Sequence, residues 1–99
     1  MAYNTDIDPR ALADIQEAMD YYEDKVTGLG DKFKEAFDKT LKHIALNPFY
    51  QIIYKDYRGL IIKEFPLYQV IFYIHEQKQT VYVDAVFLAI QDPVKKPNL

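Results

Sequence analysis

The 99-residue chain contains no cysteine, and this absence removes several kinds of chemistry at once. Without cysteine there is no disulfide framework, no thiolate nucleophile and no metal site built on sulfur. The two histidines, His43 and His75, have no second histidine or carboxylate at ligand spacing. We therefore expect no metal and no other cofactor, and we take both histidines as surface or capping residues.

Long apolar runs are also missing. No stretch approaches the roughly eighteen uninterrupted apolar residues that a membrane-spanning helix needs. The first residues do not combine a basic segment with an apolar one, as a secretion signal would. Together with the lack of cysteine, this predicts a soluble protein of the cytoplasm with no membrane partner.

Acidic side chains only slightly outnumber basic ones, and the net charge is −3. This argues against a dedicated nucleic-acid-binding protein. The charges are unevenly placed, however: residues 1–38 contain ten acidic and four basic side chains, whereas residues 39–99 contain five acidic and eight basic ones. The C-terminal half therefore remains able to face an anionic surface.

Apolar and aromatic residues are abundant. They include nine tyrosines and six phenylalanines, and 49% of the chain is hydrophobic, which is enough for a stable core. The length fits one small domain, and the sequence contains no repeats or low-complexity tracts. We therefore predict a single domain over residues 1–99, with an irregular tail over 93–99.

Local signals predict two helices in the first half. Asp8 followed by Pro9 is typical of a helix start, and the helix is expected over residues 9–26, with Gly28 as its C-cap. A second helix is expected over 31–46, because Pro48 disfavours helical geometry in the residue before it. The apolar positions recur every three or four residues, which predicts that these side chains are buried: Leu12, Ile15, Met19, Tyr22 and Val26 in the first helix, and Phe33, Phe37, Leu41 and Ile44 in the second.

The second half changes to short runs of Ile, Val, Tyr and Phe, which are typical of strands. Antiparallel strands are predicted at 49–54, 60–65, 68–75 and 80–90. The sequence KDYRG is interpreted as the turn between the first two strands, and EQKQ as the loop between the last two. Helices followed by strands indicate an α+β fold.

Both faces of the last strand are largely apolar. Side chains alternate along a strand, so Val86, Leu88 and Ile90 are expected on the face opposite that of Val83. Two helices cover one face of such a sheet, which leaves these three residues exposed as a partner interface. The alternative is that the N-terminal segment AYNT adds a strand and the tail folds over the gap.

The order of several segments resembles the RelE/ParE family of bacterial type II toxins. The segments are DIQEAMDYYE, GLGDKFKEAF, HIALNP, YRGLIIKEFP, YQVIFYI and VYVDAVFLAIQDP. The resemblance implies a β-α-α-β-β-β domain, with an N-terminal strand and a helical hairpin packed on an antiparallel sheet. It also implies a toxin of a plasmid-stabilising toxin-antitoxin system, held inactive by a cognate antitoxin.

The same resemblance leaves the target open between DNA gyrase, which is inhibited by binding, and ribosome-bound mRNA, which is cut. Many relatives have a His and an Arg where this chain has Leu88 and Gln91. Cleavage of RNA needs groups that move protons and hold phosphate, and neither residue does so. This favours a gyrase-type inhibitor or a degenerate toxin that only binds its antitoxin, and whether the chain is an enzyme stays open.

A group of polar residues remains in and after the KDYRG turn: Lys55, Tyr57, Arg58 and Lys63. Two ammonium groups, a guanidinium and a phenol are suited to binding an acidic surface or RNA, so these four residues are the expected target-binding group. The plainer interpretation is a solvated hairpin turn. In the absence of antitoxin, we also expect a homodimer to be an alternative way of covering the apolar face.

Overall fold

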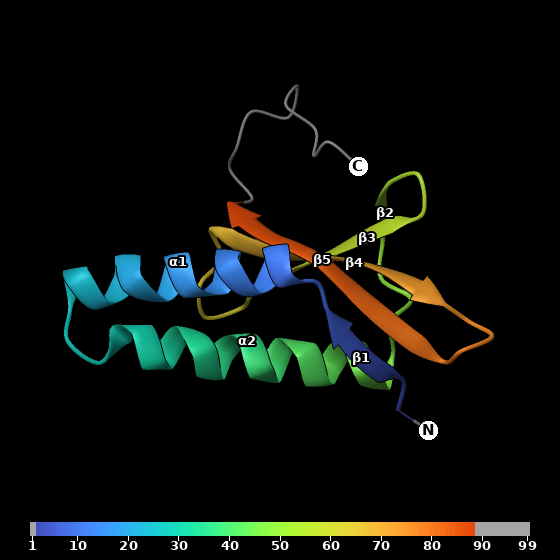
Figure 1. The fold of residues 1–99 in the computed structure, drawn as a ribbon, viewed down its shortest axis with the longest axis horizontal. Helices are drawn as coiled ribbons and strands as arrows, with labels where there is room; N and C mark the ends of the chain where they lie inside the picture. Colours follow the sequence, from blue (N-terminus) through green and yellow to red (C-terminus); the bar gives the residue numbers. More distant parts are fainter. Residues whose placement is uncertain (1, 89–99) are drawn as a thin grey trace.

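The computed structural model describes residues 2–88, which form two helices and one five-stranded sheet (Figure 1). The elements in chain order are β1 (Asn4–Ile7), α1 (Pro9–Lys25), α2 (Leu29–Leu46), β2 (Ile52–Tyr54), β3 (Tyr57–Ile61), β4 (Tyr68–His75) and β5 (Thr80–Leu88). Both helices lie on the same side of the sheet, as an antiparallel pair. The predicted α+β class with an N-terminal strand and a helical hairpin is confirmed.

Helix α1 begins where the sequence predicts. Asp8 has an extended backbone, and its carboxylate accepts a 2.8 Å hydrogen bond from the Arg10 N–H while Pro9 occupies the first helical position. The helix ends at Lys25, and the Val26 N–H still donates to the Tyr22 carbonyl oxygen. The predicted range of 9–26 is therefore confirmed to within one residue.

Helix α2 begins two residues earlier than predicted and ends at Leu46, directly before Asn47 and Pro48. The expectation that Gly28 caps α1 is wrong, because Val26 is the C-cap and Gly28 directly precedes α2. Gly28 has φ +88°, and its N–H donates to the Glu23 carboxylate. A left-handed residue at this point turns the chain from one helix into the next.

The sheet has the strand order β1-β5-β4-β3-β2 and is mixed. Strand β1 runs parallel to β5, with Asn4 opposite Thr80, while the other three pairs are antiparallel. The N-terminal segment thus adds a strand, as one of the two sequence alternatives proposed. The predicted antiparallel sheet is confirmed for β2 to β5, and β1 adds a parallel strand at its edge.

The second predicted strand, 60–65, is wrong in position. Strand β3 begins at Tyr57, because Lys55 adopts φ +49° and the turn after β2 contains only Lys55 and Asp56. The segment after β3 is a turn instead: the Phe65 N–H donates to the Ile62 oxygen, and the Tyr68 N–H to the Phe65 oxygen. Three residues of KDYRG are therefore sheet residues.

The other three predicted strands agree more closely with the structure. Of 49–54 only β2 is strand, since the Tyr50 N–H turns back to the Pro48 oxygen. The range 68–75 is confirmed as β4. The range 80–90 is confirmed to Leu88, and its last two residues lie outside the described part of the chain.

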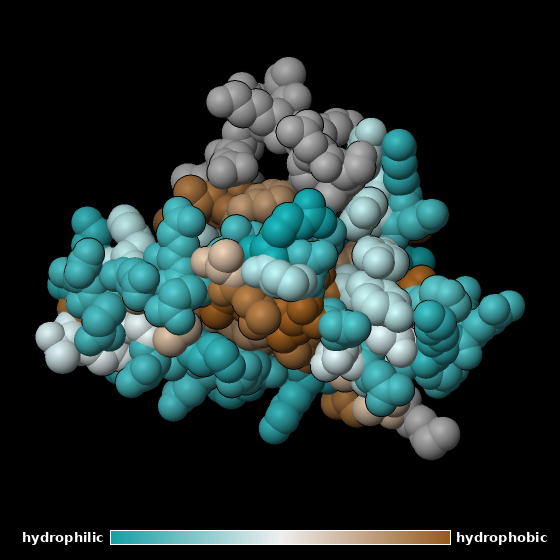
Figure 2. Space-filling view, viewed as in Figure 1, coloured by the Kyte–Doolittle hydropathy of each residue, from teal (hydrophilic) through white to brown (hydrophobic). Residues whose placement is uncertain are grey.

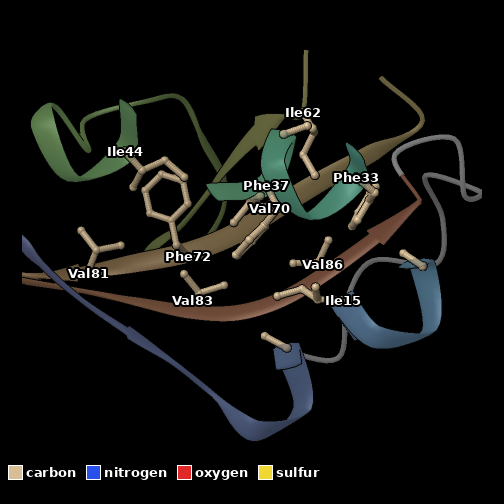
Figure 3. Close-up of a cluster of buried hydrophobic side chains, with 13 residues drawn as sticks. Ile15, Phe33, Phe37, Ile44, Ile62, Val70, Phe72, Val81, Val83 and Val86 are labelled. Atoms are coloured by element: carbon tan, nitrogen blue, oxygen red, sulfur yellow. The ribbon is translucent and has the colours of Figure 1, made fainter. Parts of the chain in front are cut away.

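The core lies between the helices and the sheet (Figure 3). Its members come from every layer: Ala11, Ile15, Ala18, Phe33, Ala36, Phe37, Ile44, Ile62, Val70, Phe72, Val81, Val83 and Val86. In α1, Ala11 and Ala18 are buried in this core, whereas Leu12 and, directly after the helix, Val26 are 51% and 60% exposed. The predicted apolar stripe is confirmed at Ile15, which is buried, and at Met19 and Tyr22, which pack against the core, and it is wrong at Leu12 and Val26.

A β-bulge interrupts the ladder between β4 and β5. Ile71 lies opposite Ala85 and Phe72 opposite Val83, so Asp84 is an extra residue of β5. The alternation of side chains shifts there, and Val83 and Val86 both face the helices (Figure 3). The expectation that Val86 is exposed is therefore wrong: it is 1% exposed.

Gly30→Ala tests how closely the two helices pack. A Cβ at Gly30 lies 2.7 Å from the Met19 backbone oxygen, a clash with a rigid group. Overpacking of this kind costs about 1–3 kcal/mol, which exceeds the gain of up to about 1 kcal/mol for alanine in a helix. We expect a lower free energy of unfolding in urea, whereas Gly28→Asn, in open space and tolerant of positive φ, stays close to wild type. A Gly30→Ala variant as stable as wild type would contradict this packing.

Candidate functional site

Three tyrosines form a ladder across the middle of the sheet, on the face turned away from the helices. Tyr73 lies directly opposite Tyr82 in the register of β4 and β5, with the rings stacked at 5.2 Å between centroids. Tyr57 of β3 packs edge-on against Tyr73 at 5.5 Å. Arg58, the next residue along β3, pairs with the buried Phe72, which places Tyr57 on the opposite, helix-free face. We call Tyr57, Tyr73 and Tyr82 the tyrosine ladder.

An ion-pair network borders the tyrosine ladder. The Arg10 guanidinium contacts the Asp84 carboxylate at 3.0 Å and the Asp8 carboxylate at 3.2 Å. Asp84 is the extra residue of the bulge in β5. The bulge therefore places the Asp84 carboxylate where it contacts Arg10 of α1. Asp8 holds the pKa of Arg10 above its usual value, with Asp84 adding to the effect. The network carries one positive and two negative charges.

The Tyr73 hydroxyl is suited to hydrogen bonding rather than to proton removal. Burial raises the pKa of Tyr73, and the neighbouring hydroxyls of Tyr57 and Tyr82 and the Asp84 carboxylate raise it further. At neutral pH the Tyr73 hydroxyl is therefore protonated. An aromatic surface with such donors binds apolar and polar groups together.

Asp14 of α1 secures the other side of the bulge. Its carboxylate accepts a 3.0 Å hydrogen bond from the Val86 N–H, which lies in β5 beyond the point where its pairing with β1 ends, at Ile7 opposite Val83. Burial raises the pKa of Asp14, since desolvation outweighs the opposing effect of that hydrogen bond, and Glu17 contributes in the same direction. Asp14 thus positions β5 rather than binding a ligand.

The four residues expected to bind a target are not brought together. Tyr57 belongs to the tyrosine ladder and Lys55 lies in the adjoining turn, 5.4 Å above the Tyr54 ring. Arg58 points to the helix side, where it donates to the Tyr50 carbonyl oxygen at 2.6 Å and lies 5.4 Å above the Phe49 ring. Lys63 follows β3, at the opposite end of that strand from Lys55.

The three residues expected to form a partner interface are likewise divided. Val86 is in the core, and Leu88 is half-buried beside a hollow that Asp14 and Tyr68 also line. Ile90 lies outside the described residues, as does Gln91.

The two histidines belong to different elements, α2 and β4. His43 is exposed near the end of α2, and the His75 ring nitrogen Nδ1 accepts a 3.2 Å hydrogen bond from the Lys78 N–H. Within residues 2–88 no three His, Asp or Glu side chains are grouped so as to hold a metal ion. No helix in the same range is long and apolar enough to cross a membrane.

Sequence reasoning missed Tyr73 and Tyr82, although a signal was present. The loop EQKQ sets His75 opposite Thr80, and two residues further from the loop Tyr73 must then meet Tyr82. Asp84 and Arg10 are 74 residues apart, and no local pattern announces their contact.

The sequence matches none of the protein-family models and none of the curated proteins with which it was compared. The fold, however, is similar to three solved structures from E. coli. The isolated RelE toxin matches with a TM-score of 0.65 and 22% identity over 94% of this chain and 90% of that one. This chain has the RelE fold.

Two further structures agree with that assignment. A RelE double mutant in the free state matches with a TM-score of 0.70 and 22% identity, covering 95% of this chain and 90% of that one. The intact RelBE toxin-antitoxin complex matches with a TM-score of 0.66 and 21% identity, covering 91% and 100%. The likeness to the RelE fold therefore spans nearly the whole chain.

Asp14→Asn tests the role of the buried carboxylate. A raised pKa means that the folded state favours the protonated acid, so this contribution to stability is present below the ordinary value of 3.8 and is lost as pH rises through the raised pKa. Asparagine keeps an oxygen for the Val86 N–H without the charge. We expect the free energy of unfolding of the variant, relative to wild type, to increase between about pH 3 and pH 7.

The matched control is Asp24→Asn, at an exposed position of the same helix. Urea unfolding at the two pH values measures both variants. A relative stability of Asp14→Asn that is constant, or that falls towards pH 7, would show that Asp14 is not held in a desolvated site.

Proposed function

We propose that the chain is the toxin of a toxin-antitoxin pair and is neutralised by a cognate antitoxin. Two observations support this proposal: the RelE fold spans nearly the whole chain, and one of the similar structures is a toxin in complex with its antitoxin. One fold can host more than one activity, so the residues of the site, and not the fold, decide which target is proposed.

The proposed toxin acts by binding a protein target, of which DNA gyrase is the leading candidate, rather than by cutting RNA. The tyrosine ladder carries this proposal. Tyrosine is among the side chains that contribute most to protein interfaces, because it buries a large rigid ring and keeps a hydroxyl for hydrogen bonding. Three such rings lie next to each other here, with Lys55 in the turn that precedes Tyr57.

The charges beside the ladder oppose RNA binding. Proteins hold the phosphate backbone mainly with lysine and arginine. Arg10 is already engaged by Asp8 and Asp84, and these three groups together carry a net charge of −1. Phosphates therefore gain little attraction at this edge of the ladder, whereas a protein surface of mixed polarity is tolerated.

Arg58 has a supporting part in this proposal. Its bond to the Tyr50 oxygen and its position over Phe49 fix the connection between α2 and β2, and thereby the hairpin that carries Lys55 and Tyr57. Replacing Arg58 would disturb the hairpin itself, so Tyr57 is the better position for a test.

The second candidate is a ribosome-dependent endoribonuclease. One observation favours it: His75 lies two residues after Tyr73 in β4, so its imidazole is on the same face of the sheet as the tyrosine ladder. The third alternative, a degenerate toxin that only binds its antitoxin, requires no activity on this face.

Tyr57→Ser separates these candidates. The wild-type chain, expressed without antitoxin, is expected to slow growth and to inhibit DNA supercoiling by gyrase, and to leave ribosome-bound mRNA intact. Loss of one interface tyrosine costs more than about 1.4 kcal/mol at a binding hot spot, so Tyr57→Ser should weaken inhibition at least about tenfold. Tyr21→Ser, at a 52% exposed position on α1, is the matched control and should inhibit like wild type.

The other outcomes are equally informative. Specific cleavage of ribosome-bound mRNA by the wild type, abolished by Tyr57→Ser and retained by Tyr21→Ser, would move the chain to the endoribonuclease class. Inactivity of the wild type in both assays, together with tight binding of antitoxin, would leave the degenerate toxin.

A further inference from the structure

The tyrosine ladder continues onto strand β1 as one row of side chains. Strand β1 runs parallel to β5, and Asp6 lies directly opposite Tyr82. Ile7, the next residue of β1, pairs with Val83 of the core, so Asp6 shares the helix-free face with Tyr82. The row therefore begins with a carboxylate on β1, and its tyrosines follow on β5, β4 and β3.

The β1 end of this row is acidic. Asp6 is exposed, and within residues 2–88 no ion pair engages it. Its neighbours Asp8 and Asp84 share Arg10. Three carboxylates and one guanidinium give this end a formal charge of −2, whereas the other end of the ladder adjoins the turn that carries Lys55. A cation is therefore attracted to the β1 end.

Tyr82 keeps one face of its ring free of other rings. The opposite face stacks on Tyr73, with 5.2 Å between the centroids and 19° between the planes. Because β5 lies between β4 and β1, the second face of the Tyr82 ring is turned towards β1, where Asp6 is the opposite residue. The face of an aromatic ring is negative, so the ring and the carboxylate attract the same kind of group.

The helix side of the molecule presents a different surface. Hydrophilic groups cover most of the two helices, with apolar surface between them and a smaller area by the C-terminal end of α2 (Figure 2). Tyr21 of α1 is 52% exposed, but Lys25 lies 5.0 Å from its ring centroid and already supplies a cation. In the part of the chain that the structure describes, no lysine or arginine lies over the ring of Tyr82. Its cation must come from a partner.

We infer that Tyr82 and Asp6 form a subsite for an arginine side chain of the protein target. The inference rests on the proposed function and adds the chemistry of the group that is bound. The guanidinium lies flat against the second face of Tyr82 and donates hydrogen bonds to the Asp6 carboxylate. Lysine fits less well, because its ammonium group has no plane that stacks on a ring while its edge binds a carboxylate.

A second copy of the chain is poorly suited to supply this arginine. The sequence contains two arginines, Arg10 and Arg58. Arg10 is paired with Asp8 and Asp84. Arg58 donates to the Tyr50 carbonyl oxygen. Either side chain would have to leave these contacts, whereas a different protein with an exposed arginine meets the subsite without that loss. The phosphates of RNA have the same sign of charge as the subsite and are repelled by it.

The first test uses a capped Gly-Arg-Gly peptide as the probe and follows the Tyr82 ring signals of the full chain by nuclear magnetic resonance. We expect a saturable shift of these signals, and no shift with the same peptide containing citrulline, which has the shape of arginine without its charge. Asp6→Asn should weaken binding of the arginine peptide at least about fivefold, because the carboxylate is lost. Asp24→Asn, at an exposed position of α1, is the matched control and should bind like wild type.

The outcomes of this test decide on the subsite directly. Tyr82 signals that do not respond to the arginine peptide would overturn it. So would an equal response to the citrulline peptide, or an affinity for the arginine peptide that Asp6→Asn leaves unchanged.

The second test measures inhibition of gyrase supercoiling by the full chain. Asp6→Asn should weaken inhibition at least about fivefold, and Asp6→Lys should weaken it further, because a lysine repels the arginine of the target. Asp24→Asn and Asp24→Lys are the controls and should inhibit like wild type. Circular dichroism and urea unfolding establish that each variant is folded.

The two tests separate this inference from the proposed function. Inhibition that Asp6→Lys leaves unchanged, or that Asp24→Lys weakens equally, would overturn the subsite and keep gyrase as the target. A wild type that binds the arginine peptide at Tyr82 but does not inhibit gyrase would support the subsite and overturn gyrase as the target. A wild type that does neither would overturn both.

Discussion

The β-bulge at Asp84 is the feature on which the rest of this structure depends. It lets Val83 and Val86 face the helices within one strand while the tyrosines keep the opposite face. Helix α1 holds the bulge from two sides, since Asp14 accepts the Val86 N–H and Arg10 pairs with Asp84. One irregularity therefore joins the core to the candidate site, because the residues that dock α1 on β5 also place a net negative charge beside the tyrosine ladder.

The fold was predictable wherever the determining signal is local. Asp8 with Pro9 and Asn47 with Pro48 set the outer limits of the helical hairpin, and a run of Ile, Val, Tyr and Phe predicted the bounds of β4. The error in β3 came from reading KDYRG as a turn. Its true turn has two residues because Lys55 adopts a left-handed conformation, which lysine rarely does and which composition does not reveal.

The candidate site was predictable only in part, because its parts are joined by tertiary contacts. Tyr57 was identified, and Tyr73 and Tyr82 follow from the hairpin register once the loop is known. The bulge was not predictable, and without it the alternation placed Val86 on the wrong face. The sequence predicts that Arg58 contacts a target, but its guanidinium donates to a backbone oxygen eight residues away, which no pattern of charge indicates.

The most direct test of the central claim is to follow the tyrosine ring signals of the labelled chain by nuclear magnetic resonance while a partner is added. We expect gyrase to shift or broaden the signals of Tyr57, Tyr73 and Tyr82 and to leave that of Tyr21, which is exposed on α1, unchanged. Single-stranded RNA at physiological salt should change none of them. RNA that shifts the three ladder signals, with no response to gyrase, would contradict the account.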